Sequence, residues 1–135
     1  MSAERNKARA LELIDRLMNE HDVDALNEFT TDPAVIGSGS GLVRAFPDLE
    51  VEVKWVVAED DMVVVFHEVR GTQQGPWLFV QEPTHRHVKT SFMLAFRFDE
   101  GGQIVDQWLG SNFVEMFDQL GWGLAPVNEV VPDRS

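Results

Sequence analysis

The N-terminal third of the chain carries the apolar pattern of amphipathic helices. Charged residues occupy the intervening positions, and apolar residues recur at spacings of three and four: Ala10, Leu13, Ile14, Leu17 and Met18. This spacing gathers apolar side chains on one face of a helix, which is the face that a core can bury. Asp22 suits the N-cap of a second, short helix that is predicted to run through Phe29.

The helical pattern breaks after Phe29. Pro33 is predicted to end the second helix, and a run that alternates glycine with serine follows from Gly37 to Gly41. Glycine is a poor helix former because its backbone loses the most conformational freedom on folding, and serine favours turns. The sequence therefore predicts a flexible connection at this run.

From Leu49 the period of the apolar residues changes to two, which is the period of a β-strand. The first predicted strand stops at the acidic turn that begins at Glu59, and its alternating residues are Val51, Val53, Trp55 and Val57. Further strands are predicted over residues 62–72, 77–81, 88–98 and 103–110. Because the turns between them are short, sequential strands are expected to pair antiparallel.

Helices followed by a run of antiparallel strands predict an α+β fold, with helices packed on one face of a curved sheet. The length suits one domain over residues 1–135. Its predicted parts are a helical cover, a sheet, a closing helix and an irregular tail, at about residues 3–46, 49–111, 112–120 and 121–135.

Six short motifs, in order over about three-quarters of the chain, resemble those of the SnoaL-like polyketide cyclases. They are Ala45–Leu49 (AFPDL), Arg70–Thr72 with Gly75 (RGT-x-x-G), Pro83-Thr84 with Arg86, Phe96–Phe98 (FRF), Ile104-Val105 with Trp108, and Gln119–Gly121 (QLG). That family belongs to the nuclear-transport-factor-2-like superfamily. The resemblance implies a cone-shaped α+β barrel, but the motifs are more specific for a fold than for an activity.

Four residues after Trp108, where the resemblance implies a catalytic Asp, this chain has Asn112. An amide cannot usefully accept the proton that such a carboxylate takes, so the family's cyclase reaction is not expected from this residue. Asn112 precedes Glu115 by three positions, an arrangement close to a capping box. We interpret Asn112 as the N-cap of the closing helix, with hydrogen bonding to a ligand as the alternative.

Two titratable residues remain as candidates for acid/base catalysis. Asp106 alternates with Ile104 and Trp108, so it is expected on the same face as that tryptophan, and an ion pair with Arg97 is the alternative. His67 lies among valines in the middle of a predicted strand. It is either a hydrogen-bonded residue of the sheet or a base in a pocket.

The aromatic residues of the predicted strands either fill the interior or line a hydrophobic pocket. The candidate ligand-binding residues are Trp55, Trp108, Phe92, Phe96 and Asn112. Apolar residues such as Val64, Phe66 and Leu94 predict a second, outer surface, which a homodimer could bury through the sheet.

Composition narrows the classes of partner. The net charge of −12, from 11 basic and 23 acidic residues, disfavours both nucleic acids and anionic membranes. The absence of cysteine fits the reducing cytoplasm and removes thiolate metal ligands. His85 and His87 lack a third ligand at a suitable spacing, so neither a metal nor another cofactor is expected.

The sequence favours a domain that binds a small hydrophobic molecule without catalysis, because the expected acid/base is missing and no catalytic pair replaces it. One alternative is an enzyme that acts on a small apolar carbonyl or cyclic substrate through Asp106 or His67. The other is a structural domain that dimerises through its sheet.

Overall fold

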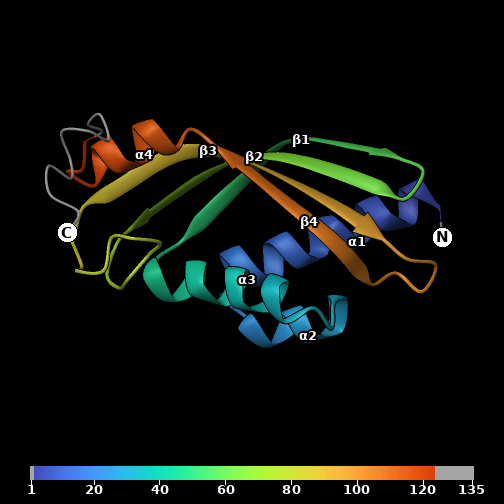
Figure 1. Ribbon diagram of the computed structural model, residues 1–135. Coiled ribbons are helices and arrows are strands. Elements are labelled where there is room, and N and C mark those ends of the chain that lie inside the picture. Colours follow the sequence, from blue (N-terminus) through green and yellow to red (C-terminus); the bar gives the residue numbers. More distant parts are fainter. Residues whose placement is uncertain (1, 124–135) are drawn as a thin grey trace, which may run out of the picture.

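The computed structural model describes residues 2–123 as one open, curved sheet with helices packed on one face (Figure 1). All strands pair antiparallel and follow one another in chain order: β1 (Glu50–Glu59), β2 (Met62–Thr72), β3 (His87–Phe98) and β4 (Ile104–Ser111). The central strands are therefore β2 and β3, and β1 and β4 are the edges. The predicted α+β class and antiparallel sheet are confirmed.

Helical segments that precede the sheet in sequence cover its inner face (Figure 1). They are α1 (Ala3–Ile14), the π-helical turn η1 (Asp15–Asn19), the 3₁₀ turn η2 (Val23–Ala25), α2 (Leu26–Phe29) and α3 (Pro33–Ala45). One further helix, α4 (Phe113–Gln119), follows β4 and packs against β3. No helix within residues 2–123 is long and apolar enough to cross a membrane.

One local prediction near these helices needs correction. Asp22 does precede η2, but its carboxylate accepts a hydrogen bond from Arg16 at 3.2 Å and does not cap the turn. The irregular tail predicted over residues 121–135 falls outside the described residues from 124 onward, so it stays a prediction.

A third helix, α3, takes the place of the flexible connection that the glycine-serine run predicts. Pro33, which was predicted to end the second helix, instead begins α3, and Asp32 caps α3 by accepting a hydrogen bond from the Ala34 N–H at 2.9 Å. Each helical glycine costs about 1 kcal/mol relative to alanine. Burial of other α3 side chains offsets that cost: Val35, Leu42, Val43 and Ala45.

The segment after Gln73 is a tight loop and not the strand predicted over residues 77–81. Trp77 and Val80 exchange two backbone hydrogen bonds of 2.9 Å, and Leu78 between them has a φ of 52°. The buried Gln73 side chain donates to carbonyls of this loop at 2.9 to 3.4 Å. These hydrogen bonds hold the loop, and residues 77–81 pair with no strand of the sheet.

The central strands alternate strictly between a buried and a partly exposed face. In β2 the buried side chains are those of Val63, Val65, His67 and Val69. In β3 the buried side chains face the same helices: Val88, Thr90, Phe92, Leu94, Phe96 and Phe98. This inner face and the apolar face of α1 form one hydrophobic core.

The edge strand β1 contains a bulge. Val53 pairs with His67, but Trp55 pairs with Phe66, so Lys54 is the extra residue. A bulge of one residue moves every later side chain of its strand to the opposite face. Trp55 therefore stacks on Phe66 of the outer face, at 4.9 Å between ring centroids.

The other edge strand, β4, is bulged in the same way. Ile104 pairs with Phe98 but Asp106 pairs with Arg97, which leaves Val105 as the extra residue. Ile104 is buried with the core, whereas Asp106 lies beside Arg97 on the outer face. The alternation expected from the sequence therefore reverses within β4.

The effect of the α3 glycines on stability can be tested by replacing them with alanine. A Cβ added at Gly37 or Gly41 would have no atom within 4 Å. We expect Gly37→Ala and Gly41→Ala each to raise the free energy of unfolding by about 0.5–1 kcal/mol, because alanine gains helix propensity without a clash. Urea denaturation measures this change.

Gly39→Ala is the matched control. Its Cβ would lie 3.0 Å from one methyl of Leu26 and 3.1 Å from a methyl of Leu17. We expect the crowding to cancel the gain in propensity. Equal stabilisation by all three substitutions would contradict this account of α3.

Candidate functional site

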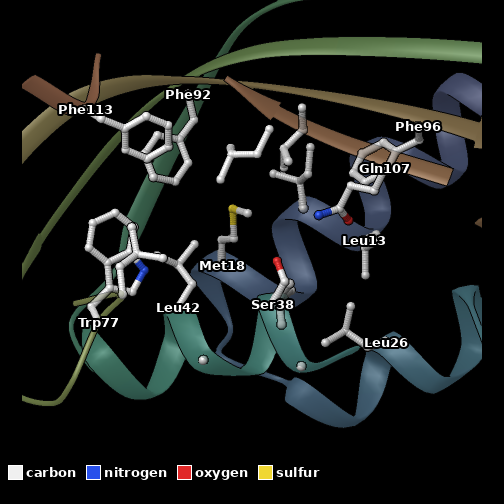
Figure 2. Close-up of a pocket in the computed structure, with 18 of the residues that line it drawn as sticks. Leu13, Met18, Leu26, Ser38, Leu42, Trp77, Phe92, Phe96, Gln107 and Phe113 are labelled. Carbon is white, nitrogen blue, oxygen red and sulfur yellow. The ribbon is translucent and has the colours of Figure 1, made fainter. Parts of the chain in front are cut away.

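A pocket of about 280 Å³ lies between the inner face of the sheet and α3 (Figure 2). Strands β3 and β4 line one side, and α3 lines the other, with α1, η1 and the loop at Trp77 between them. The volume lies near the lower end of the range for small-molecule sites.

The inner part of the pocket is apolar and buried. Phe92 and Phe96 project into it from β3, and Leu13, Met18 and Leu26 face them from the helical cover (Figure 2). The exposed side chains of Leu78 and Leu109 also line the pocket. Because these two residues belong to the loop and the β4 edge, we place the mouth between α3 and β4.

Glycine leaves room on the α3 side of the pocket. Gly37 and Gly41 are one helical turn apart and both line the pocket without a side chain. Gly39 also serves a packing role, since it lets α3 approach Leu17 and Leu26 closely. The run that was expected to be a flexible connection is instead one wall of the site.

The pocket is electrically neutral. Its lining within the described residues includes no aspartate, glutamate, histidine, lysine or arginine. The polar side chains that reach it are Gln107 of β4 and Ser38 of α3, and the indole of Trp77 closes one end (Figure 2). The site suits an uncharged, largely apolar molecule.

Asp106, a candidate catalytic residue, is not among the residues that line this pocket. Its carboxylate accepts a hydrogen bond from Arg97 at 3.1 Å, and the side chain is 48% exposed. Arg97 also lies near Asp61 and over the Trp108 ring. The bulge at Val105 accounts for this placement, because it turns Asp106 away from the face of Ile104.

His67, the other catalytic candidate, points toward the helices but is fully buried. Its ring meets Phe92 edge-on at 6.0 Å between centroids, and Phe92, not His67, lines the pocket. Neither ring nitrogen has a hydrogen-bond partner within the described part of the chain. Burial lowers the pKa of His67 to about 4, so the imidazole is neutral at physiological pH.

The two candidate tryptophans lie on the outer face of the sheet and not in the pocket. Trp55 is 68% exposed and Trp108 is 48% exposed. Each follows the bulge of its edge strand, at Lys54 or at Val105, which is the physical reason for the change of face.

Asn112 caps α4, as the capping interpretation predicts. Its side-chain oxygen accepts a hydrogen bond from the Glu115 N–H at 3.1 Å, and its amide donates to the Glu115 carboxylate at 3.1 Å. Asn112 is exposed and lies outside the apolar pocket, whereas its neighbour Phe113 lines it. A hydrogen bond from Asn112 to a ligand stays a prediction, and it would have to form outside this pocket.

Of the predicted ligand-binding residues, Phe92 and Phe96 are brought together in the pocket. Reasoning from the sequence missed Gln107, Ser38 and Leu109, because the bulge and the helical state of α3 decide their direction. No group of three potential metal ligands gathers among residues 2–123.

The motifs shared with the cyclases hold the fold together at two places. Asp48 accepts a hydrogen bond from the Thr72 N–H at 2.7 Å, and Gly71 leaves room for that approach. Gln119 docks α4 on β3 by two hydrogen bonds to the backbone of Lys89, at 2.7 and 3.0 Å. These motif residues therefore have structural roles.

An open antiparallel sheet closed by helices over an apolar pocket defines a small α+β domain of the cone-shaped kind. The family profile described as SnoaL-like polyketide cyclase matches residues 34–120. The chain belongs to this family, as the sequence motifs predict. A search of curated proteins finds no match to the chain.

Solved structures share this fold. AclR of Streptomyces galilaeus, a proposed hydroxylase, is 27% identical with a TM-score of 0.74, over 89% of this chain and 98% of AclR. A proposed SnoaL-like polyketide cyclase from Jannaschia sp. CCS1 is 24% identical with a TM-score of 0.67, over 89% of this chain and 94% of its own. A SnoaL-like polyketide cyclase from Agrobacterium tumefaciens is 17% identical with a TM-score of 0.70, over 90% of this chain and 100% of its own.

The buried imidazole of His67 gives a prediction for stability against pH. Its folded-state pKa of about 4 lies below the ordinary value of 6.5, so the unfolded chain binds the proton more tightly. Stability from this group is therefore full above about pH 6.5 and falls as the pH drops toward 4. We expect a loss of about 2 kcal/mol between pH 7.5 and pH 5.

His67→Phe should abolish this part of the pH dependence, because phenylalanine does not titrate. Urea denaturation of both proteins at the two pH values measures the difference, and the carboxylates common to both cancel. An NMR titration of the His67 ring provides a second readout. A ring that titrates near pH 6.5 in the folded protein would overturn the prediction.

Proposed function

We propose that this domain binds a small, uncharged, hydrophobic molecule in the pocket between α3 and the sheet. The observation that carries the proposal is an apolar lining without an ionisable side chain among the described residues. Such a lining favours burial of an apolar ligand, and it offers no group to transfer a proton in the pocket. The described polyketide cyclases of the family support a ligand of polyketide-like chemistry.

Acid/base catalysis in the same pocket is the alternative function. Its support is the family, whose members include proposed cyclases, and the similarity to AclR, a proposed hydroxylase. These descriptions name two different reactions, so they do not favour one chemistry. The positions of Asp106 and His67, on opposite faces of the sheet, speak against a catalytic pair formed by them.

We propose that the domain acts without a nucleic acid, a membrane or a cofactor. A net charge of −12 supports the exclusion of polyanionic partners. The lack of cysteine supports a location in the reducing cytoplasm.

Filling the pocket should prevent binding. Gly41→Leu introduces a side chain on the wall of a pocket of about 280 Å³, at a position with free space around the Cβ. We expect the affinity for the neutral fluorescent probe N-phenylnaphthylamine to fall about tenfold or more, since the added leucine occupies the ligand's volume. Fluorescence titration measures the dissociation constant.

The control for this titration is Trp55→Leu, which removes a ring that is 68% exposed on the outer face. Its affinity for the probe should equal that of the unmodified protein. A loss of binding in Trp55→Leu with none in Gly41→Leu would place the probe on the sheet surface and reject the pocket.

We propose in addition that the outer face of the sheet binds a second copy of this chain. Trp55, Val57, Met93 and Trp108 are 47% or more exposed there, although solvent-facing strand positions are usually polar. Val64 and Phe66 lie between them on the outer face, as the sequence predicts. The prediction for Leu94 was wrong, because Leu94 lies on the inner face and lines the pocket.

The charges around this surface support a copy of the chain as its partner. Basic side chains pair with acidic ones on both sides of the apolar centre, as in Lys54–Glu52, Arg70–Glu50, Lys89–Glu68 and Arg97–Asp106. The charges of these four pairs cancel, whereas the whole chain carries −12. Two acidic copies repel each other least through such a face.

Trp55→Glu should convert a dimer into a monomer, because it places a charge in the apolar centre of the face. Sedimentation velocity of the unmodified protein and the variant measures the state. The control is Val114→Glu, an equally apolar and 60% exposed position on α4, away from the sheet. An unmodified protein that is monomeric at high micromolar concentration would reject the dimer.

A further inference from the structure

Two polar side chains enter the pocket from opposite sides near its mouth. Gln107 comes from the inner face of β4, where its strand neighbour Phe96 and the nearby Leu109 are apolar, and Ser38 comes from α3 (Figure 2). Gln107 is half-buried and Ser38 is exposed. Both residues lie between the apolar interior and the solvent.

Neither side chain has a hydrogen-bond partner among residues 2–123. The contrast with Ser40 is informative, because its hydroxyl donates to the Ile36 carbonyl at 2.7 Å within the same helix. The Ser38 hydroxyl instead points toward the space that Gln107 also faces (Figure 2). Both groups are therefore available to a bound molecule, and each can donate and accept.

We propose that Gln107 and Ser38 hold an uncharged oxygen of the ligand, a carbonyl or a hydroxyl, at the mouth of the pocket. This inference rests on the proposed binding function and specifies the polar part of the ligand. The apolar body of the ligand then lies inward, against Phe92 and Phe96.

The physical reason is the cost of removing water from the Gln107 amide. A ligand that fills the pocket displaces water from this half-buried group. A hydrocarbon returns no hydrogen bond to the amide, whereas a ketone or an alcohol restores one. A carboxylate would restore one too, but the pocket lining offers no positive charge to compensate its lost hydration.

Three neutral compounds of nearly equal shape test the inference: methyl naphthyl ketone, the corresponding secondary alcohol, and ethylnaphthalene. Their affinities are measured by displacement of N-phenylnaphthylamine from the full chain. We expect the ketone and the alcohol to bind about three- to tenfold more tightly than the hydrocarbon.

Gln107→Leu should remove this preference by weakening the two oxygen-bearing compounds and leaving the hydrocarbon bound. Ser38→Ala should reduce the preference less, since Ser38 is more exposed. Ser40→Ala is the matched control and should change nothing in the preference, because its hydroxyl is occupied within α3. If Gln107→Leu does not fold, Gln107→Met and Ser38→Ala provide the same comparison.

The outcomes separate this inference from the proposed function. Failure of all three compounds and the probe to bind would reject the binding function itself. Binding of all three with equal affinity, or a preference that survives both Gln107→Leu and Ser38→Ala, would reject the role of the polar pair while the pocket stands.

Discussion

Burial of a single face of the sheet against the helices is the constraint on which the rest of the structure depends. The central strands β2 and β3 have neighbours on both sides, and they must keep the period of two to hold Val65, Phe92 and Phe96 in the core. The edge strands have a neighbour on one side only, so they can accommodate an extra residue. Both edges of this sheet do so, at Lys54 and at Val105.

These two bulges decide the chemistry of both faces. They carry Trp55, Asp106 and Trp108 to the outer face and bring Gln107 to the inner one. The inner pocket is left without charge, and the outer face gains aromatic surface bounded by ion pairs. The same local change in the backbone, at both edges, thus separates a neutral pocket from an exposed aromatic surface.

The glycine-serine run illustrates how tertiary packing overrides local propensity. Its glycines oppose helix formation, yet the Asp32 cap and the buried side chains of α3 stabilise the helix. Gly39 permits the close approach to Leu17 and Leu26, and Gly37 and Gly41 leave the pocket open. Glycines that would weaken an isolated helix here leave space for the pocket on one face of α3.

The sequence by itself determined the α+β class, the limits of the central strands and the capping role of Asn112, because these depend on local periodicity and on side chains near in sequence. It also identified Phe92 and Phe96 as residues that line the pocket, because both lie on a strand without a bulge. Only the tertiary structure decided which face of the sheet Asp106 and Trp108 occupy. It also decided that residues 37–41 are helical and that His67 packs against Phe92. A bulge shifts every later residue of its strand by one position, and packing outweighs propensity, so neither effect can be read from the alternation of residues alone.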